Sequence, residues 1–245
     1  MDTTKFLGIE FANLTYQEVL SELDKLSHAD SFSYIITPNV DHVVQLYEGQ
    51  DKSVRMLFNE AYNDATFCIC DSRILQLLAK IQGIKLDVVT GSDLTALLFE
   101  SGYLDGREVV IVGGDDRILT DLSARFPNVG LIQHQPPMKL LCDHKAREAV
   151  KNFIAESGCN FVLFAVGAPQ SEIIAHACRN DENVRGVGIC VGASIEFLLG
   201  RKTRAPRWMR RLGLEWLFRL IKEPRRLSRR YLIDGPKIFK LWLCK

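Results

Sequence analysis

Short apolar runs alternate along the chain with longer segments in which apolar residues recur at helical spacing. Several runs, such as residues 161–166 (Phe-Val-Leu-Phe-Ala-Val), are apolar at every position, which is typical of strands buried on both faces. Seven strands are predicted: Ser33–Thr37, Thr66–Cys70, Lys85–Val89, Glu108–Val112, Gly130–His134, Asn160–Val166 and Gly186–Val191. The helices predicted between them are Val40–Glu48, Arg73–Ile81, Leu94–Ser101, Arg117–Arg125, His144–Ser157 and Ser171–Arg179. This alternation indicates an α/β fold with a largely parallel, Rossmann-like sheet covered by helices.

Charge divides the chain into two parts. The whole sequence of 245 residues carries a net charge of only +1, yet residues 1–200 hold 16 basic and 27 acidic residues, whereas residues 201–245 hold 15 and 3. We therefore predict an α/β core in residues 1–200 and a basic, helical C-terminal appendage in residues 201–245. A basic segment of this kind favours an anionic partner, such as a nucleic acid, a phosphorylated substrate or a membrane surface.

Composition and motifs exclude several classes of protein. With 47% hydrophobic and 25% charged residues, the chain has the composition of a folded protein. The N-terminus has no apolar core of a secretory signal, and no stretch approaches the roughly 18–20 apolar residues of a spanning helix. Seven scattered cysteines without a CxxC pair indicate reduced thiols in a cytosol and argue against a zinc site. The chain also lacks GxGxxG and GxxxxGK[ST], so a nicotinamide or P-loop nucleotide site is disfavoured.

Asp71 directly follows the apolar run Phe67–Cys70, at a predicted strand-to-helix junction. Ligands of parallel α/β sheets bind at the carboxyl ends of the strands, so a carboxylate here can act as a general base. The ordinary role of Asp at such a junction, however, is to cap the next helix. The sequence leaves both interpretations open and, taken alone, favours the cap.

Two further junctions carry polar residues. Thr37 and Asn39 flank Pro38 after the first predicted strand, where they suit either a sugar or base contact or a simple turn. Gln170 and Glu172 lie where a loop enters a helix, a position that favours an anionic ligand or an acidic first turn. The five histidines show no metal-ligand spacing, so no metal site is predicted.

The appendage interleaves arginines with apolar and aromatic residues at helical spacing, and Pro206 and Pro224 separate short helices. Such helices can lie in a membrane interface with arginines on anionic headgroups. They can also dock on the protein's own core, bind nucleic acid or hold a diphosphate. Arginines outnumber lysines in this segment, which favours specific contacts to oxyanions.

Together these segments resemble the WecG/TagA/CpsF glycosyltransferases, in order and over nearly the whole chain. The resemblance is carried by the segments 37–39 (TPN), 71–73 (DSR), 89–94 (VTGSDL), 112–114 (VGG), 136–138 (PPM), 167–172 (GAPQSE), 204–206 (RAP), 214–220 (LEWLFRL) and 223–226 (EPRR). The block from residue 204 to residue 226 is the most specific. The Asp-Ser-Arg form with Pro-Pro-Met is similar to the GumM-like exopolysaccharide branch, because many members have Asp-Gly instead.

The resemblance implies a bacterial enzyme that moves a sugar from a UDP-sugar to a polyprenyl-diphosphate-linked saccharide in the synthesis of exopolysaccharide, capsule, teichoic acid or common antigen. It implies that Asp71 is the base, that Thr37 and Asn39 line the active site, and that C-terminal arginines lie over the diphosphate. We add Gln170 and Glu172 to the predicted substrate cleft. The arginines predicted to contact the diphosphate are Arg204, Arg219, Arg225 and Arg226.

We therefore expect an inverting glycosyltransferase that needs no cofactor, with UDP-glucose, UDP-ManNAc or UDP-ManNAcA as donor. Residues 201–245 are expected to hold it on the inner face of the cytoplasmic membrane through anionic lipids, without binding nucleic acid. The departures from the family pattern at Ser72, Val88 and Ser171 leave the donor sugar open. The alternative is a non-catalytic α/β protein whose basic tail binds nucleic acid or membrane.

Overall fold

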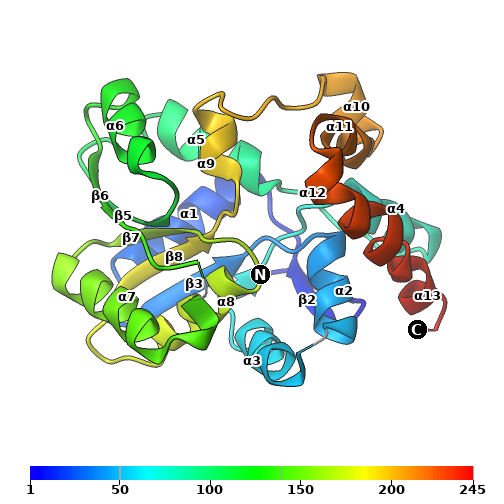
Figure 1. Ribbon diagram of the computed structural model, residues 1–245, viewed down its shortest axis with the longest axis horizontal. Coiled ribbons are helices and arrows are strands. Elements are labelled where there is room, and N and C mark those ends of the chain that lie inside the picture. Colours follow the sequence, from blue (N-terminus) through cyan, green and yellow to red (C-terminus); the bar gives the residue numbers. More distant parts are fainter. Residues whose placement is uncertain (50, 139, 245) are drawn as a thin grey trace.

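The computed structural model describes residues 1–49, 51–138 and 140–244 (Figure 1). Within these ranges, eight strands form one sheet in the order β1-β2-β4-β3-β8-β7-β5-β6. The strands are β1 (Thr3–Phe6), β2 (Ile9–Ala12), β3 (Phe32–Ile36), β4 (Phe67–Cys68), β5 (Glu108–Gly113), β6 (Gly130–His134), β7 (Phe161–Ala165) and β8 (Gly186–Cys190). Only the pair β1–β2 is antiparallel; all other paired strands are parallel, which confirms the predicted fold class.

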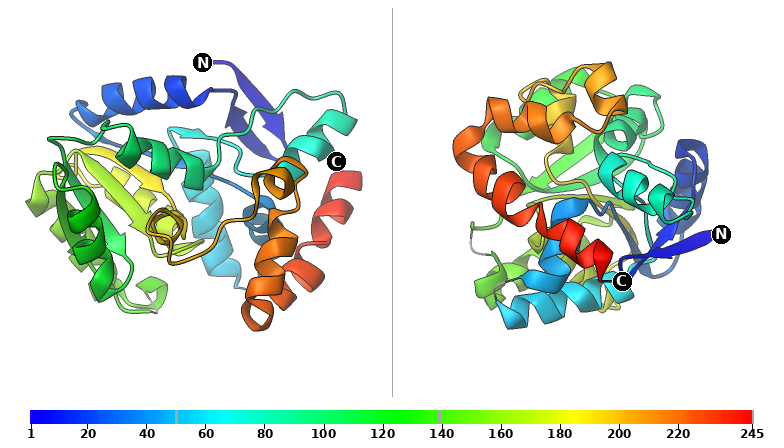
Figure 2. Two further views of the ribbon diagram at one scale, coloured as in Figure 1. Left: turned by 90° about the horizontal axis from the view of Figure 1, so that it is seen from above. Right: turned by 90° about the vertical axis from the view of Figure 1, so that its right-hand side faces the viewer.

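Helices cover both faces of the sheet (Figures 1 and 2). One face packs against α2 (Val40–Glu48), α3 (Lys52–Asn63), α4 (Arg73–Ile81), α7 (His144–Ser157) and α8 (Gln170–Arg179). The other packs against α1 (Tyr16–Ser27), α5 (Gly91–Glu100), α6 (Asp116–Arg125) and α9 (Ser194–Leu198). Within β3, Tyr34 and Ile36 enter the first core and Ile35 enters the second, because successive side chains of a strand point to opposite faces. Burial on both faces explains the uniformly apolar strands.

The appendage consists of short helices that run down one side of the molecule beside α2 and α4 (Figure 1, orange to red). They are α10 (Arg207–Arg211), α11 (Glu215–Lys222), α12 (Pro224–Ser228), the π-helical turn η2 (Arg229–Asp234) and α13 (Lys237–Leu243). Leu227 and Ile238 are buried, and Ile238 belongs to the same hydrophobic core as β3 and α2. The last residue of the predicted appendage, 245, lies outside the described residues. The structure thus shows these helices docked on the core, as one of the alternatives held.

The prediction of a strand at Lys85–Val89 is wrong. The segment is extended but joins its neighbour only through one isolated bridge, from Val88 to Cys70. Side chains bind two of its other backbone groups, since Gln76 Nε2 donates to the Leu86 carbonyl (2.9 Å) and the Asp87 N–H donates to Asn13 Oδ1 (3.2 Å). A backbone that bonds to side chains cannot also form a regular ladder.

The hairpin β1–β2 and the helices α1 and α3 were not among the predicted elements. A further short 3₁₀ turn, η1, spans Leu140–Cys142. Across the described ranges, no helix combines the length and the apolar character needed to cross a membrane.

Candidate active site

Three of the predicted site residues, together with Ser194, which was not predicted, lie at the carboxyl ends of four neighbouring strands. Thr37 follows β3, Asp71 comes shortly after β4, Glu172 lies beyond β7, and Ser194 lies beyond β8. The sheet order β4-β3-β8-β7 places these ends side by side. This is the edge at which parallel α/β sheets bind their ligands, and no two of these residues are close in sequence.

Gly91, the first residue of α5, lies at the centre of this group. A Cβ at this position would lie 3.2 Å from Thr37 Oγ1, 3.5 Å from Ser194 Oγ and 3.6 Å from Asp71 Oδ2, so the three polar side chains surround the glycine. The backbone amide of Gly91 also lowers the pKa of the Asp71 carboxyl. The first amides of a helix have no partner within the helix and carry partial positive charge, so the start of α5 stabilises a negative charge on Asp71.

Asp71 does not cap the following helix, although its residue type and position favoured that role. Ser72 is the cap of α4, and its Oγ accepts the Leu75 N–H at 3.2 Å. The Asp71 backbone N–H instead donates to the Pro38 carbonyl at 2.9 Å. The Asp71 carboxyl is therefore free of the capping role and faces the group around Gly91.

The environment of Asp71 shifts its acid–base behaviour toward neutral pH. Burial raises the pKa of the carboxyl to about 7; the Arg219 guanidinium and the Gly91 N–H oppose this rise, and the Glu215 carboxylate adds to it. The side chain nevertheless keeps partial access to solvent. A carboxyl with a pKa near the working pH is well suited to accept and release a proton.

Thr37 and Asn39 bind parts of the protein as well as lining the strand ends. Thr37 Oγ1 donates to the Cys190 carbonyl at 3.0 Å, which ties the ends of β3 and β8 together. Asn39 is the cap of α2, and its Oδ1 accepts the Asp41 N–H at 3.0 Å. Both contacts fix the turn, so its ligand-binding role remains a prediction.

Gln170 and Glu172 differ in their surroundings. Gln170 is partly exposed, and its Nε2 donates to the Val166 carbonyl at 3.4 Å. Glu172 is only 2% exposed, and its Oε1 lies 3.4 Å from His42 Nε2. The Glu172 side chain thus points into the protein toward α2, and sequence reasoning missed its partner His42.

Two appendage arginines bind one carboxylate of the core. Asp93 Oδ1 lies 2.6 Å from Arg204 Nη1 and 3.3 Å from Arg210 Nη1, and Asp93 Oδ2 accepts from Thr90 Oγ1 at 2.8 Å. Asp93 belongs to the first turn of α5, the same helix whose first amide reaches Asp71. The docking of the appendage is therefore mechanically joined to the helix that stabilises the candidate base.

Arg219 is the appendage residue whose charge acts most strongly on Asp71. Its Nη2 pairs with Glu215 Oε1 at 2.7 Å, and its guanidinium lies 4.7 Å from the centre of the Phe197 ring. Its charge is the strongest influence that lowers the pKa of Asp71. The structure thus brings the predicted arginine Arg219 to the site from a segment almost 150 residues further along the chain.

Arg225 and Arg226 are placed differently. Both side chains belong to exposed residues of α12, and Arg226 Nε pairs with Glu223 on its own turn at 2.6 Å. The structure therefore does not bring these two arginines to Asp71. In contrast, Arg230, which was not predicted, pairs with Asp41 of α2 at 3.0 Å, two residues from Asn39.

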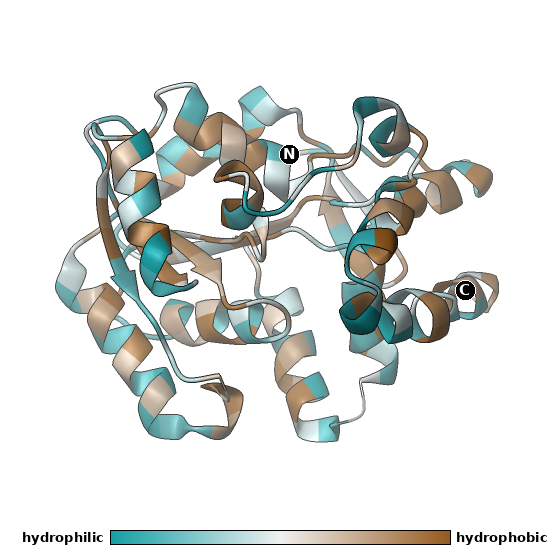
Figure 3. Ribbon diagram, turned by 45° about the horizontal axis from the view of Figure 1, so that its top comes forward, coloured by the Kyte–Doolittle hydropathy of each residue, from teal (hydrophilic) through white to brown (hydrophobic). Residues whose placement is uncertain are grey.

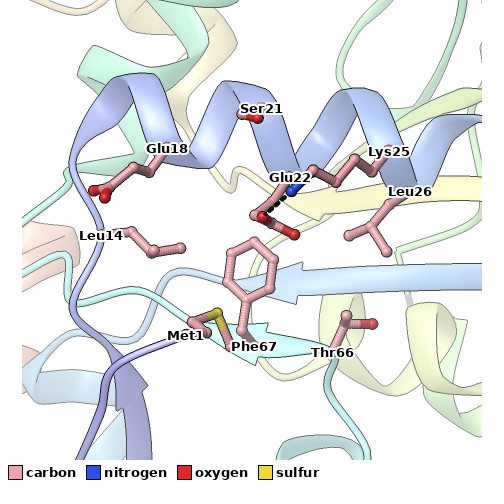
Figure 4. Close-up of a pocket in the computed structure, with 9 residues that line it drawn as sticks. All are labelled: Met1, Leu14, Glu18, Ser21, Glu22, Lys25, Leu26, Thr66 and Phe67. Carbon is pink, nitrogen blue, oxygen red and sulfur yellow. Dashed lines mark hydrogen bonds and ion pairs between the residues drawn. The ribbon is translucent and has the colours of Figure 1, made fainter.

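Other surfaces offer little chemistry. A depression between α1 and the start of β4 is lined by side chains from both elements, and its Lys25 pairs with Glu22 at 2.7 Å (Figure 4). It includes Thr66, which precedes β4, so it lies toward the opposite end of that strand from Asp71. In residues 1–49, 51–138 and 140–244, no group of three or more His, Cys, Asp or Glu side chains is arranged to hold a metal ion.

We predict that Asp93→Asn loosens the appendage, because one carboxylate holds both Arg204 and Arg210. The amides of α10 and α11 should then exchange with deuterium faster than in the unsubstituted protein, and the free energy of unfolding should fall by about 1 kcal/mol. Asp87→Asn, which removes an exposed partner of Lys85, is the matched control and should change neither quantity. Unaltered exchange in α10 and α11 would contradict the proposed attachment.

The features of this site occur in an order that a known family shares. The model of the glycosyl transferase WecG/TagA/CpsF family matches residues 4–245, which covers both the strand ends and the appendage. The match includes Asp71 and the arginine-rich segment that packs beside it. The chain therefore belongs to the WecG/TagA/CpsF family of glycosyltransferases, whose members act in the synthesis of cell-surface polysaccharides.

Proposed function

We propose that the protein transfers a sugar, with inversion, from a UDP-sugar to a polyprenyl-diphosphate-linked saccharide. The proposal rests on the position of the Asp71 carboxyl, which lies where four strand ends and the appendage come together. Its pKa of about 7 suits proton transfer. Family membership supports glycosyl transfer as the reaction.

In the proposed reaction, Asp71 accepts the proton of an acceptor hydroxyl. The hydroxyl oxygen then attacks the anomeric carbon from the face opposite the leaving group, and the bond from that carbon to the diphosphate oxygen breaks. The electron pair of this bond stays on UDP, which gains negative charge, and the proton remains on Asp71 until solvent removes it. Thr37 and Asn39 would border the reacting groups, since both flank the turn that binds the Asp71 backbone.

The appendage supplies positive charge for the leaving diphosphate. Four of its arginines have an Nε atom that is buried and has no hydrogen-bond partner within the described residues, namely Arg204, Arg210, Arg219 and Arg230. Guanidinium groups with unused donors suit phosphate oxygens, which accept two parallel hydrogen bonds. We assign Arg219 the contact nearest the reaction, because its charge acts on Asp71.

The outer side of the appendage supports contact with an anionic membrane. Hydrophobic and hydrophilic positions alternate along its helices in Figure 3. Exposed apolar side chains are Trp208, Leu212, Ile221, Leu232, Ile233, Phe239 and Leu243, and exposed basic residues between them include Arg207, Arg211, Arg225, Arg229 and Lys240. Such a surface suits the interface of a bilayer with acidic headgroups, and a lipid-linked acceptor lies there. We therefore propose a peripheral position on the cytoplasmic face.

Asp71→Asn tests the base directly. Transfer should fall by about 100-fold or more, because the amide cannot accept the proton, while the rate of the unsubstituted enzyme should rise with pH through about 7. Transfer is measured with short-chain polyprenyl-diphosphate saccharides and a panel of UDP-sugars, and the anomeric configuration of the product reports inversion. Near-normal transfer by Asp71→Asn would remove Asp71 as the base.

The same substitution should stabilise the fold above neutral pH. The folded-state pKa of Asp71 lies above its ordinary value, so folding favours the protonated form and stability decreases as pH rises between about 4 and 7. Asp71→Asn should therefore raise the free energy of unfolding at pH 8 by on the order of 2 kcal/mol, after allowance for partial solvent exposure. The gain should shrink as the pH falls toward 4. Denaturant unfolding at both pH values measures it.

Arg219→Gln should move the pH profile of transfer. Loss of the guanidinium removes the largest influence that holds down the pKa of Asp71, so the inflection should shift upward by about one pH unit. Lys222→Gln removes one positive charge from an exposed position on the same helix and is the control. A profile that changes in height but keeps its inflection would show that Arg219 does not act on the base.

Membrane contact is tested by co-sedimentation with vesicles of neutral and anionic lipid. Replacement of both Leu232 and Ile233 by Asp should reduce binding to anionic vesicles by about tenfold, because two exposed apolar contacts are lost and two negative charges are added. The matched control replaces Met56 and Leu57, an exposed apolar pair on α3 of the core, by Asp. Equal loss in both variants would rule out the appendage as the membrane surface.

A further inference from the structure

The fully buried carboxyl of Glu172 has a contact pattern that stability alone does not explain. Its Oε1 lies 3.4 Å from His42 Nε2, and its Oε2 has no hydrogen-bond partner in the part of the chain that the structure describes. Burial of a carboxyl group with so few partners costs free energy, and an apolar side chain would cost less. We therefore looked for a role of the Glu172 carboxyl in its contact with His42.

The contacts of the His42 ring select one of its tautomers. The backbone N–H of Asn39 donates to His42 Nδ1 at 3.3 Å, so this nitrogen carries no proton. The ring proton of the neutral imidazole is then on Nε2, which faces Glu172 Oε1. A carboxyl that receives the second ring nitrogen of a histidine fixes both the tautomer and the orientation of the ring.

Two hydrogen bonds of a single peptide group link His42 to the candidate base. The peptide between Pro38 and Asn39 donates its N–H to His42, and its carbonyl accepts the Asp71 N–H at 2.9 Å. Glu172, His42, this peptide and Asp71 therefore form one continuous series that joins α8, α2, the end of β3 and the end of β4. The two hydrogen bonds of this peptide polarise each other, and the Glu172 carboxyl beside His42 Nε2 helps to align the ring that accepts the first of them.

We propose that Glu172 and His42 are positioning residues that orient Asp71 through the Pro38–Asn39 peptide. The inference rests on the proposed role of Asp71 as the base. It gives Glu172 a role inside the protein and adds His42, which was not among the predicted site residues, to the groups that orient the base. The pair does not touch the substrate in this assignment.

The tautomer and the backbone contact can be tested without any activity assay. Nitrogen-15 spectra of the histidine rings should show His42 protonated at Nε2 and unprotonated at Nδ1, with the signal identified by its loss in His42→Asn. The Asp71 amide should exchange with deuterium about tenfold faster in His42→Gln and in Glu172→Gln. A proton on Nδ1, or an unchanged Asp71 amide, would overturn the proposal.

Kinetics then separate positioning from substrate binding. His42→Gln keeps a donor toward Glu172 but loses the acceptor for Asn39, and Glu172→Gln keeps the shape of the side chain but loses its charge. Each should lower kcat by about tenfold with little change in donor KM, and the double variant should be no worse, because the two residues act in one series. Additive losses, or a change confined to KM, would contradict the proposal.

The chain offers a matched control on the same helix. His176 of α8 pairs with Asp64 at 2.8 Å near the surface, so His176→Gln and Asp64→Asn remove a comparable pair outside the series. Both should leave kcat and the Asp71 amide unchanged, and thermal unfolding checks that every variant folds. Activity retained in Asp71→Asn would defeat the proposed base, whereas an inactive Asp71→Asn beside fully active Glu172→Gln and His42→Gln would defeat this inference alone.

Discussion

Desolvation of one carboxyl group is the constraint on which the rest of the site depends. Asp71 follows shortly after a strand whose two faces are both covered, so its side chain lies where water is scarce and its charged form is disfavoured. Polar groups nearby then shift the balance in either direction: Arg219, His42 and the first amide of α5 favour the charged carboxylate, and Glu215 disfavours it. Removal of water makes such weak and distant partners effective.

The architecture explains how a small set of residues reaches one place. Parallel strands all deliver their carboxyl ends to the same edge, so Thr37, Asp71 and Ser194 meet although they lie far apart in sequence. Gly91 has no Cβ, and a side chain at this position would crowd all three polar groups. The appendage reaches the same edge from the outside and adds a net positive charge, whereas the core carries a net negative charge.

Much of this could be predicted from the sequence, because apolar strands buried on both faces leave an unmistakable pattern. The positions of Thr37 and Asp71 at strand ends followed from that pattern, and the family resemblance directed attention to the arginines. The capping residue could not be predicted, since Asp71 and Ser72 are both good caps and only the backbone geometry selects Ser72. The strand expected at Lys85–Val89 failed for a similar reason, because side-chain partners of its backbone lie far away in the sequence.

A count of charges likewise could not predict which residues of the appendage and the core form ion pairs. A sequence states that one part is basic and the other acidic, but not that Asp93 receives two arginines while Arg225 and Arg226 remain exposed. The His42–Glu172 contact could not be predicted either, because it joins α2 to α8, which lie far apart in the sequence. Local patterns define elements, whereas pairing between elements depends on the tertiary fold.

The way the appendage is attached gives the molecule two regions with unequal sensitivity to ionic strength. Within the described residues, Ala205, Leu227 and Ile238 are the only buried apolar side chains of the appendage, and Leu241 and Trp242 pack against the core partly buried. Partly exposed ion pairs, such as Arg201 with Asp115 and Lys237 with Glu48, add to this attachment. Mobile ions screen such pairs over about 8 Å at physiological salt, but they do not weaken a packed interior. In the peripheral position that we propose, acidic lipid headgroups would compete with the core carboxylates for the arginines of the appendage.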